Sequence, residues 1–287
     1  MITAKSSPAF EMRTTHSGKI KITNWNKARI MMTGTFVILT FLTIYGFLAL
    51  DYKDIHFAQA AIDTLNNVRL IFLQPSLHNF SMGEALYQIG LTIGLGFLAT
   101  ILGAVLSLFI ALFAAKNLSP KPIANAIIVI VAFIRAVPTV LWVLIFAIAA
   151  GLGSEAAVLG MLLHTVAFLV KAFAESFEDL DDGIIEALRA SGASWWHVVT
   201  NAVLPSTAAS LLSWTFLRFE TNFTVAVAMG AAAGAGGIGF ELFMASSFYF
   251  DMREVGFITY AILLVAVLLE LASTQLKKRY LVKEAVR

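Results

Sequence analysis

The chain has 287 residues, of which 59% are hydrophobic and 13% are charged, and its mean hydropathy is +0.83. A soluble globular protein is about 45–50% apolar and about 25% charged, so this composition excludes a soluble enzyme and a disordered protein. The absence of cysteine excludes a disulfide-stabilised domain, a thiolate metal site and a cysteine nucleophile. At about 20 residues per membrane-spanning helix, the apolar content suits roughly six crossings.

Long stretches with few charges predict an all-α membrane protein with six transmembrane helices. The predicted spans cover residues 30–50, 85–115, 123–154, 156–174, 205–230 and 255–276. The predicted organisation is a tail (1–29), a first transmembrane helix (30–50), an external loop (51–84), a core of five helices (85–276) and a basic tail (277–287). Within the core, residues 175–204 form a polar connection.

The Lys and Arg residues predict the orientation in the membrane, because cytoplasmic loops are enriched in them. Of the 20, fifteen lie in the two tails, in the connections after the second and fourth spans, and at Lys171 near the end of the fourth span. Three lie on the opposite side, and two, Arg135 and Arg218, lie inside spans. We therefore expect both termini in the cytoplasm, with lipid around the apolar surface and no nucleic acid as a partner.

The connection 175–204 carries six acidic residues on the predicted cytoplasmic side. Asp182 is placed to cap a short helix, and Gly192 to end it in a left-handed conformation. Ser194 is placed to cap a second short helix, which Pro205 is expected to end. This pattern indicates a docking surface or an ordinary interfacial hairpin.

The segment EALRASG at 186–192, followed by nine residues and AVLP at 202–205, resembles the EAA loop of ABC importer permeases. Glu186, Ala187, Gly192, Leu204 and Pro205 match that pattern, whereas Leu188 and Ala202 depart from it. The resemblance implies a type I ABC importer permease fold in the bacterial inner membrane, with a coupling helix that docks on a separate ATPase subunit. It also implies a second permease chain, expected to be an identical copy, and an extracytoplasmic substrate-binding protein. ATP and Mg²⁺ would bind on the ATPase, so this chain is expected to be no enzyme and to hold no cofactor or metal.

Further stretches, RAVP at 135–138 and RFETN at 218–222 with the glycines that follow, resemble the phosphonate-type permeases. The resemblance implies transport of phosphonate or a related oxyanion such as phosphate, phosphite or a phosphate ester. The family often has an arginine shortly after the segment matching 220–222, where this chain has FTV, so the particular oxyanion stays open. The alternatives are an importer for another small solute and an ion-coupled secondary transporter. The secondary transporter is disfavoured by the absence of an internal repeat.

Arg135 and Arg218 are predicted at similar depths, about 18–20 Å from the cytoplasmic ends of their helices. A charge near the bilayer centre costs roughly 2.5–3.5 kcal/mol, so each should face protein or water. With Glu220 they are candidate translocation-pathway residues. The structural alternative is that each arginine pairs with Glu220, Glu270 or free carbonyls at helix packing sites. Pro138 has no amide hydrogen to donate to the carbonyl of Ile134, which is expected to loosen the helix next to Arg135.

Two further features have competing interpretations. His164, in the middle of the fourth span, is interpreted as a packing histidine rather than a proton relay. The sequence GAGGIG at 234–239 matches a dinucleotide-binding pattern literally, but no strand precedes it. Gly234, Gly236, Gly237 and Gly239 instead indicate a bend or an outer gate.

Overall fold

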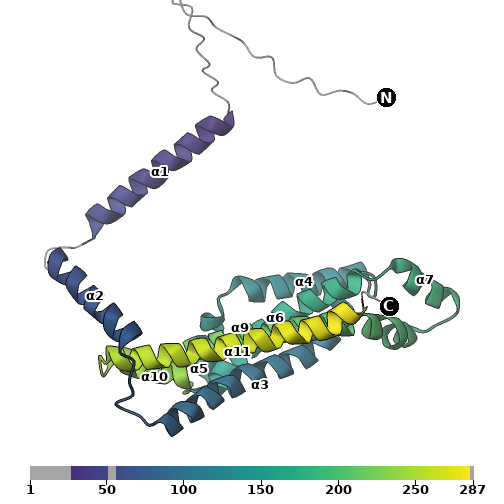
Figure 1. The fold of residues 1–287 in the computed structure, drawn as a ribbon. Coiled ribbons are helices and arrows are strands. Elements are labelled where there is room, and N and C mark those ends of the chain that lie inside the picture. The colour runs from purple at the N-terminus through teal and green to yellow at the C-terminus, as the bar shows by residue number, and fades with distance from the viewer. Residues whose placement is uncertain (1–26, 51–55, 285–287) are drawn as a thin grey trace, which may run out of the picture. The chain divides into compact units, whose positions relative to one another are not determined.

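The structure is a computed structural model that describes residues 27–50 and 56–284, with side chains as far as residue 275 (Figure 1). The chain divides into two compact units, Met1–Ile62 and Asp63–Arg287. The predicted tails, 1–29 and 277–287, fall largely outside the described residues and side chains. Every described element is helical, which confirms the predicted all-α class.

The first unit contains helix α1 (Lys27–Ala49), which corresponds to the first predicted span. Every residue of α1 is exposed, and its most apolar window has a mean hydropathy of 1.8. A helix that is apolar all round and buries nothing in its own unit is suited to a lipid environment.

Helix α2 (Phe57–Leu73) occupies much of the stretch predicted as an external loop. Its C-terminal turn, which belongs to the second unit, packs on α11 (Met252–Glu284). A side chain at Gly256 would collide with the carbonyl oxygen of Ile71, and the Tyr260 hydroxyl donates to the carbonyl of Phe72 at 2.8 Å. The sequence pattern missed this helix because it has 17 residues, too few to cross the membrane.

The second unit holds the remaining helices. They are α3 (Met82–Ala114), α4 (Lys121–Ala136), α5 (Thr139–Ala150), α6 (Ser154–Glu178), α7 (Asp182–Ala190), α8 (Trp195–Val198), a π-helical turn η1 (Val199–Val203), α9 (Leu204–Ala233), α10 (Ile238–Ser247) and α11. Within the described residues, α1, α3, α6 and α11 are each long and apolar enough to cross a membrane. Two bent pairs could supply two further spans.

The third predicted span, 123–154, is not one straight helix. It consists of α4 and α5, which meet at 89° around Val137 and Pro138. The proline breaks the helix because it cannot donate an amide hydrogen and its ring crowds the preceding turn.

Proline has the opposite outcome at position 205, where the prediction that Pro205 ends a short helix is wrong. The helix that starts at Trp195 passes through η1 and continues into α9. The amide of Leu204 donates to the carbonyl of Val199, five residues back, and Pro205 lies in the first turn of α9. The wider π turn accommodates a residue that has no amide hydrogen to donate.

The interior of this unit is formed where α6 packs against α3, α5 and α9. Small residues line the contacts, since a side chain at Gly103 would lie 2.5 Å from the Thr165 methyl group. A side chain at Gly160 would lie 2.4 Å from Val143. Such close approach gives tightly packed helices in a membrane, where dispersion and hydrogen bonds replace the hydrophobic effect.

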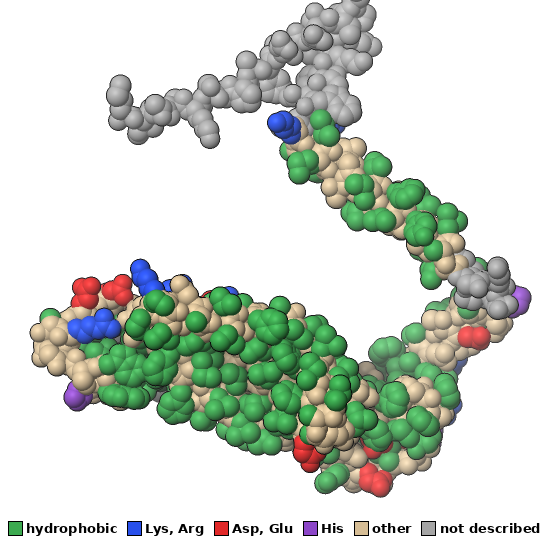
Figure 2. Space-filling model, turned by 180° about the vertical axis from the view of Figure 1, so that it is seen from behind, with side chains coloured by type: hydrophobic (Ala, Val, Ile, Leu, Met, Phe, Trp, Pro, Cys, Tyr) green, Lys and Arg blue, Asp and Glu red, His purple; other side chains and the backbone are tan. Residues whose placement is uncertain are grey.

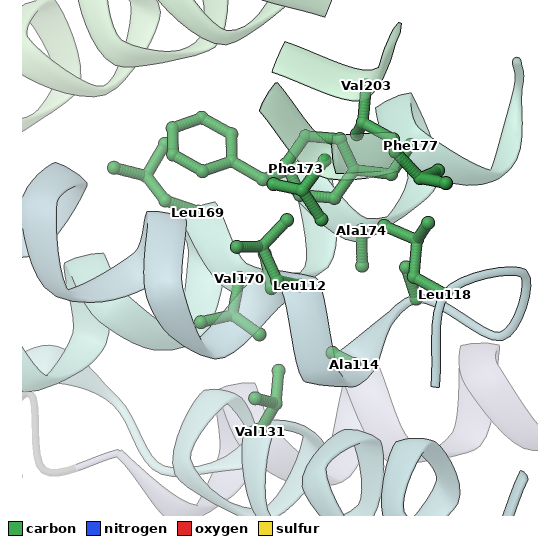
Figure 3. Close-up of a cluster of buried hydrophobic side chains, with 14 of the residues drawn as sticks. Leu112, Ala114, Leu118, Val131, Leu169, Val170, Phe173, Ala174, Phe177 and Val203 are labelled. Atoms are coloured by element: carbon green, nitrogen blue, oxygen red, sulfur yellow. The ribbon is translucent and has the colours of Figure 1, made fainter. Parts of the chain in front are cut away.

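A cluster of buried apolar side chains lies where α3, α4 and α6 meet α7 and η1 (Figure 3). It includes Leu112, Phe173, Phe177 and Val203, and it reaches Ile185 on α7, which is 3% exposed. Figure 2 shows apolar side chains over the flank of the Asp63–Arg287 unit and charged side chains gathered at its two ends. This distribution is typical of a bundle that crosses a bilayer.

Candidate functional site

The helix pair α7–α8 is displayed at one end of the bundle by local caps. Asp181, rather than the predicted Asp182, caps α7 and accepts a hydrogen bond from the amide of Gly183 at 2.9 Å. Ser194 caps α8, as predicted, through the amide of His197. A one-residue uncertainty of this kind is usual when two adjacent aspartates can each cap a helix.

Gly192 ends α7 in the left-handed region that the sequence predicted, with φ of +85°. Its amide donates to the carbonyl of Arg189, and the amide of Ala193 donates to the carbonyl of Leu188. These two bonds form a Schellman motif, which satisfies the last carbonyls of the helix. The turn between α7 and α8 is therefore determined by the backbone at one glycine.

The five residues of the predicted ATPase-coupling surface differ in exposure. Glu186, Ala187, Gly192 and Pro205 are exposed. Leu204 is partly buried and packs against the apolar cluster of Figure 3. Four positions are thus available to a partner, and the fifth anchors the segment.

The connection between α3 and α4 braces the helix pair. The Arg189 guanidinium donates to the carbonyl of Asn117 at 3.1 Å, and the Trp195 indole donates to that of Leu118 at 2.9 Å. On the other side, Glu178 accepts from the amide of Lys116 at 2.8 Å. The helix pair is therefore tied to α4, the helix that carries Arg135.

A second site lies inside the bundle, around the ring of Phe168 on α6. Arg218 on α9 is 6% exposed, and its guanidinium carbon lies 5.3 Å from the centre of that ring. Arg135 on α4 is exposed, and its guanidinium carbon lies 6.0 Å from the same centre. Both distances fit cation–π contacts, and the structure thus brings together two arginines that the sequence placed only at similar depths.

Polar side chains orient Arg218. Its Nε donates to the Thr165 hydroxyl at 3.1 Å, and its Nη2 lies 3.2 Å from Nδ1 of His164. Asn222, fully buried, donates to the hydroxyls of Thr100 at 2.8 Å and Thr165 at 2.9 Å. The arginine is therefore held by a network that spans α3, α6 and α9.

Neither arginine pairs with a carboxylate within the part of the chain that the structure describes. The ion pairs found there join His78 to Asp251 and Lys171 to Glu175. Glu220 is partly buried and Glu270 is exposed, and neither is paired with an arginine there. Two cations that share one ring without a counter-ion leave a strong preference for an anion.

The Ile134 carbonyl, which Pro138 cannot satisfy, has a partner that the sequence did not reveal. The indole of Trp142 donates to it at 3.0 Å across the bend between α4 and α5. The sequence signal was available: a tryptophan one turn after a proline can reach back to the carbonyl that the proline leaves open. The bond fixes the chain directly beside Arg135.

The glycines at 234–239 lie at a bend of 48° between α9 and α10. Gly234 ends α9 with φ of +61°, and a side chain at Gly239 would lie 1.8 Å from the carbonyl oxygen of Val227. Gln88 on α3 accepts from the amide of Gly237 and donates to Glu241. The bend is therefore tightly packed and tied to α3.

Near the same end of the bundle, carboxylates that the sequence analysis did not single out bind the connection before α3. Glu254 is 1% exposed and accepts from the amides of His78 and Asn79 and from the Asn79 side chain. Asp251 pairs with His78. Burial raises the pKa of Asp251, but hydrogen bonds from His78 and from the amides of Glu254 and Arg253 outweigh it and lower the pKa.

The described residues include no group of three or more His, Asp or Glu side chains that could hold a metal ion. A bundle of apolar helices that displays a helix pair at one end and holds, among the described residues, two arginines without a carboxylate partner is consistent with the membrane-spanning subunit of a transporter. The chain belongs to the family described as the binding-protein-dependent transport system inner membrane component, which it matches over residues 103–280.

Two curated relatives illustrate the similarity. The chain is 36% identical over 190 residues to the phosphite transport system permease protein PtxC of Stutzerimonas stutzeri, covering 66% of this chain and 68% of that protein. It is 35% identical over 156 residues to the phosphate-import permease protein PhnE of Mycolicibacterium smegmatis, covering 53% of this chain but only 29% of that protein.

Among solved structures, a chain of the inward-facing MetNI methionine ABC transporter has a TM-score of 0.65. It is 18% identical in sequence, and the match covers 71% of this chain and 99% of that chain. The likeness shows the fold, and it confirms the predicted ABC importer permease architecture. The chain is thus an integral inner-membrane subunit that works with a separate ATPase and a substrate-binding protein, and the family assignment excludes both a secondary transporter and a membrane enzyme.

Proposed function

We propose that this chain carries a phosphorus oxyanion, such as phosphonate, phosphite, phosphate or a phosphate ester, across the membrane. The observation that carries the proposal is the pair of arginines on Phe168, which have no carboxylate partner in the described structure. A translocated anion would neutralise them transiently. The printed names of relatives, which include phosphite, phosphate and phosphonate permeases, support the same substrate class.

The proposed translocation pathway runs past Arg135, Arg218 and Glu220. Arg218 lies inside the bundle and Arg135 at its surface, so the ring between them links buried and open space. Glu220, partly buried two residues after Arg218, points to another side of the helix. Its carboxylate is therefore proposed to line the pathway away from the two arginines rather than to contact them.

The proposal is tested by reconstituting the permease with its ATPase and binding protein in proteoliposomes. ATP-dependent uptake of labelled phosphate, phosphite and methylphosphonate is then compared with uptake of methionine. Uptake of at least one oxyanion is expected to fall at least tenfold in Arg218→Gln and in Arg135→Gln at equal protein level, and Arg253→Gln, an exposed arginine away from the ring, serves as the control. Methionine uptake without oxyanion uptake would instead indicate an importer for another small solute.

The coupling role of the proposal falls on Glu186, Ala187, Gly192, Leu204 and Pro205. Their support is the exposure of four of them on a capped helix pair, with Ile185 and Leu204 anchored in the apolar cluster. We propose that α7 sits in a groove of the ATPase. The bracing of Asn117 and Leu118 by Arg189 and Trp195 would then carry its movement to α4.

We propose that the complex contains two identical permease chains. Each chain has both termini in the cytoplasm and binds no cofactor itself. Positive charge in the tails and in the connections near α7 supports the orientation. Gly234, Gly236, Gly237 and Gly239 would form the outer bend or gate. Accessibility of single cysteines to a membrane-impermeant reagent in intact cells tests the orientation, and the mass of the purified complex tests the stoichiometry.

A further inference from the structure

His164 on α6 faces Arg218, and the contact determines which ring nitrogen carries a proton. Nη2 of the guanidinium lies 3.2 Å from Nδ1 of the imidazole. A guanidinium has donors only, so Nδ1 must accept and cannot itself carry a proton. The imidazole is therefore neutral, with its proton on Nε2.

The remaining donors of this pair are open to a ligand. Buried side-chain nitrogens or oxygens without a hydrogen-bond partner, among the described residues, belong to Asn117, Ser119 and Ser273. Nε2 of His164 and Nη1 of Arg218 take part in no hydrogen bond there, yet they are absent from that set. Both atoms therefore reach accessible surface rather than being sealed in the bundle.

The neighbouring acceptors are already used. The Thr165 hydroxyl accepts from Nε of Arg218 and from the Asn222 amide, and it lies 3.3 Å from the Asn222 carbonyl oxygen, to which it donates. A hydroxyl has one proton and two lone pairs, so Thr165 has nothing left to offer a ligand. His164 precedes Phe168 by four residues, which places both on one face of α6.

We propose that His164, Arg218 and Arg135 form one oxyanion-binding site in the pathway, in which neutral His164 donates through Nε2. The site offers donors only, so it suits the ionised oxygens of a tetrahedral oxyanion, and a protonated oxygen of the ligand must point away from it. This inference rests on the proposed function, and it adds His164 as a residue that contacts the transported anion. It also implies that this site accepts a fully ionised anion such as sulfate. The binding protein must then be the subunit that distinguishes the phosphorus oxyanions from sulfate.

Two substitutions separate donation to the ligand from support of Arg218. The amide of His164→Asn can place an oxygen near the former Nδ1 and keep the acceptor for Arg218, but it has no donor at the position of Nε2. His164→Gln can place an amide donor near Nε2. Hydrogen bonds to charged groups are the strong ones, so we expect the import rate of phosphite to fall roughly tenfold or more in His164→Asn and to be largely retained in His164→Gln.

The rates are measured in proteoliposomes with ATPase and saturating binding protein, at equal complex content, with His56→Asn as the control at an exposed histidine outside the bundle. Equal rates in wild type, Asn and Gln variants would overturn the inference. Equal loss in both variants, with intact complexes, would also overturn it, because it would assign His164 to the support of Arg218. If the wild type imports phosphite, phosphate and methylphosphonate at no measurable rate, the proposed function itself fails.

A second measurement leaves His164 in place. The chain has no cysteine, so Ala136→Cys places a single thiol in this chain at an exposed position next to Arg135. We expect phosphite to slow the reaction of this thiol with an anionic methanethiosulfonate at least threefold, followed on this chain by mass spectrometry. The same protection should vanish in Arg218→Gln, and protection that persists there, or that is absent with His164 and Arg218 intact, contradicts a shared oxyanion site.

Discussion

The α7–α8 helix pair, which is the proposed coupling end, and the cationic cluster of Arg135, Arg218 and His164 around Phe168 are built in opposite ways. The helix pair at the coupling end depends on caps and a turn within residues 181–205, each acting on neighbours a few residues away. The cluster on Phe168 takes one arginine from α4, another from α9 and its histidine from α6. The shape of the first surface is therefore set locally, although bonds to Asn117 and Leu118 hold it to the bundle. The second site exists only when three helices meet.

If the coupling end is a locally built docking surface, reversing a charge there should abolish ATPase binding without disturbing the bundle. Glu186→Lys and Gly192→Asp are expected to lose co-purification of the ATPase almost completely, with normal amounts of permease in the membrane. Glu186 is exposed and Gly192 has φ of +85°, so one change alters the surface and the other also strains the turn. Asp179→Lys, an exposed reversal in the same connection, should leave binding intact; unchanged binding in Glu186→Lys would remove the docking assignment.

The cationic cluster should respond to a change that never touches an arginine. Asn222→Leu removes the bonds to the hydroxyls of Thr100 and Thr165. Thr100 keeps its bond to the Gly96 carbonyl and Thr165 keeps its bond from Arg218, so each lost bond costs about 0.5–1.5 kcal/mol. We expect a lower thermal unfolding midpoint and roughly tenfold slower import, because the Thr165 hydroxyl, no longer fixed by Asn222, orients Arg218 less firmly. Thr207→Val changes a buried threonine whose hydroxyl bonds within its own helix, and it is the matched control. If the two variants behave alike, the Asn222 network has no specific role in transport.

The bend beside Arg135 gives a smaller expected effect. Trp142→Phe keeps an aromatic ring but removes the donor to the Ile134 carbonyl, at a cost of about 1–2 kcal/mol. Import should slow a few-fold while ATPase binding stays normal. Trp196→Phe, at an exposed tryptophan of the coupling end, is the control and should change neither import nor ATPase binding. A loss of ATPase binding in Trp142→Phe would mean that the two regions are not separable.

The smallest effect is expected at the carboxylates that bind the connection before α3, which belong to neither region. The folded protein lowers the pKa of Asp251 from its ordinary value of 3.8, so its contribution to stability is present above that value and is lost as pH falls below it. The group is close to solvent, which keeps the contribution small. Between pH 5 and pH 3, the thermal unfolding midpoint should therefore fall about 1–2 °C further in the wild type than in Asp251→Asn. An equal fall in both proteins would rule out this linkage.

The difference between the two regions also explains which features the sequence revealed. Gly192 and Ser194 could be assigned before the structure was known, because a cap or a left-handed turn depends on residues within one helical turn. The effects of the two prolines could not be assigned in the same way. Pro138 breaks a span, and the Trp142 indole bonds to the carbonyl that this proline leaves open. Pro205 does not break its helix, because a π turn precedes it.

The cationic cluster was visible in the sequence only in part. Arg135 and Arg218 stood out because charges are rare in apolar spans. His164 was also noticed, but it was interpreted as a packing histidine, since a single histidine in a span has no local signal that distinguishes packing from ligand binding. Its role follows from its contact with an arginine 54 positions away in the chain.

By itself, the sequence determined an all-α membrane protein, the family of importer permeases, and the segment expected to meet the ATPase. Those properties follow from composition and from local patterns, which a chain carries without reference to its fold. The tertiary structure alone decided that two arginines share one aromatic ring, with no carboxylate partner in the described part of the chain, and that His164 must accept from one of them. The physical reason is that electrostatic and hydrogen-bond partners are chosen by distance in space, and helix packing sets that distance.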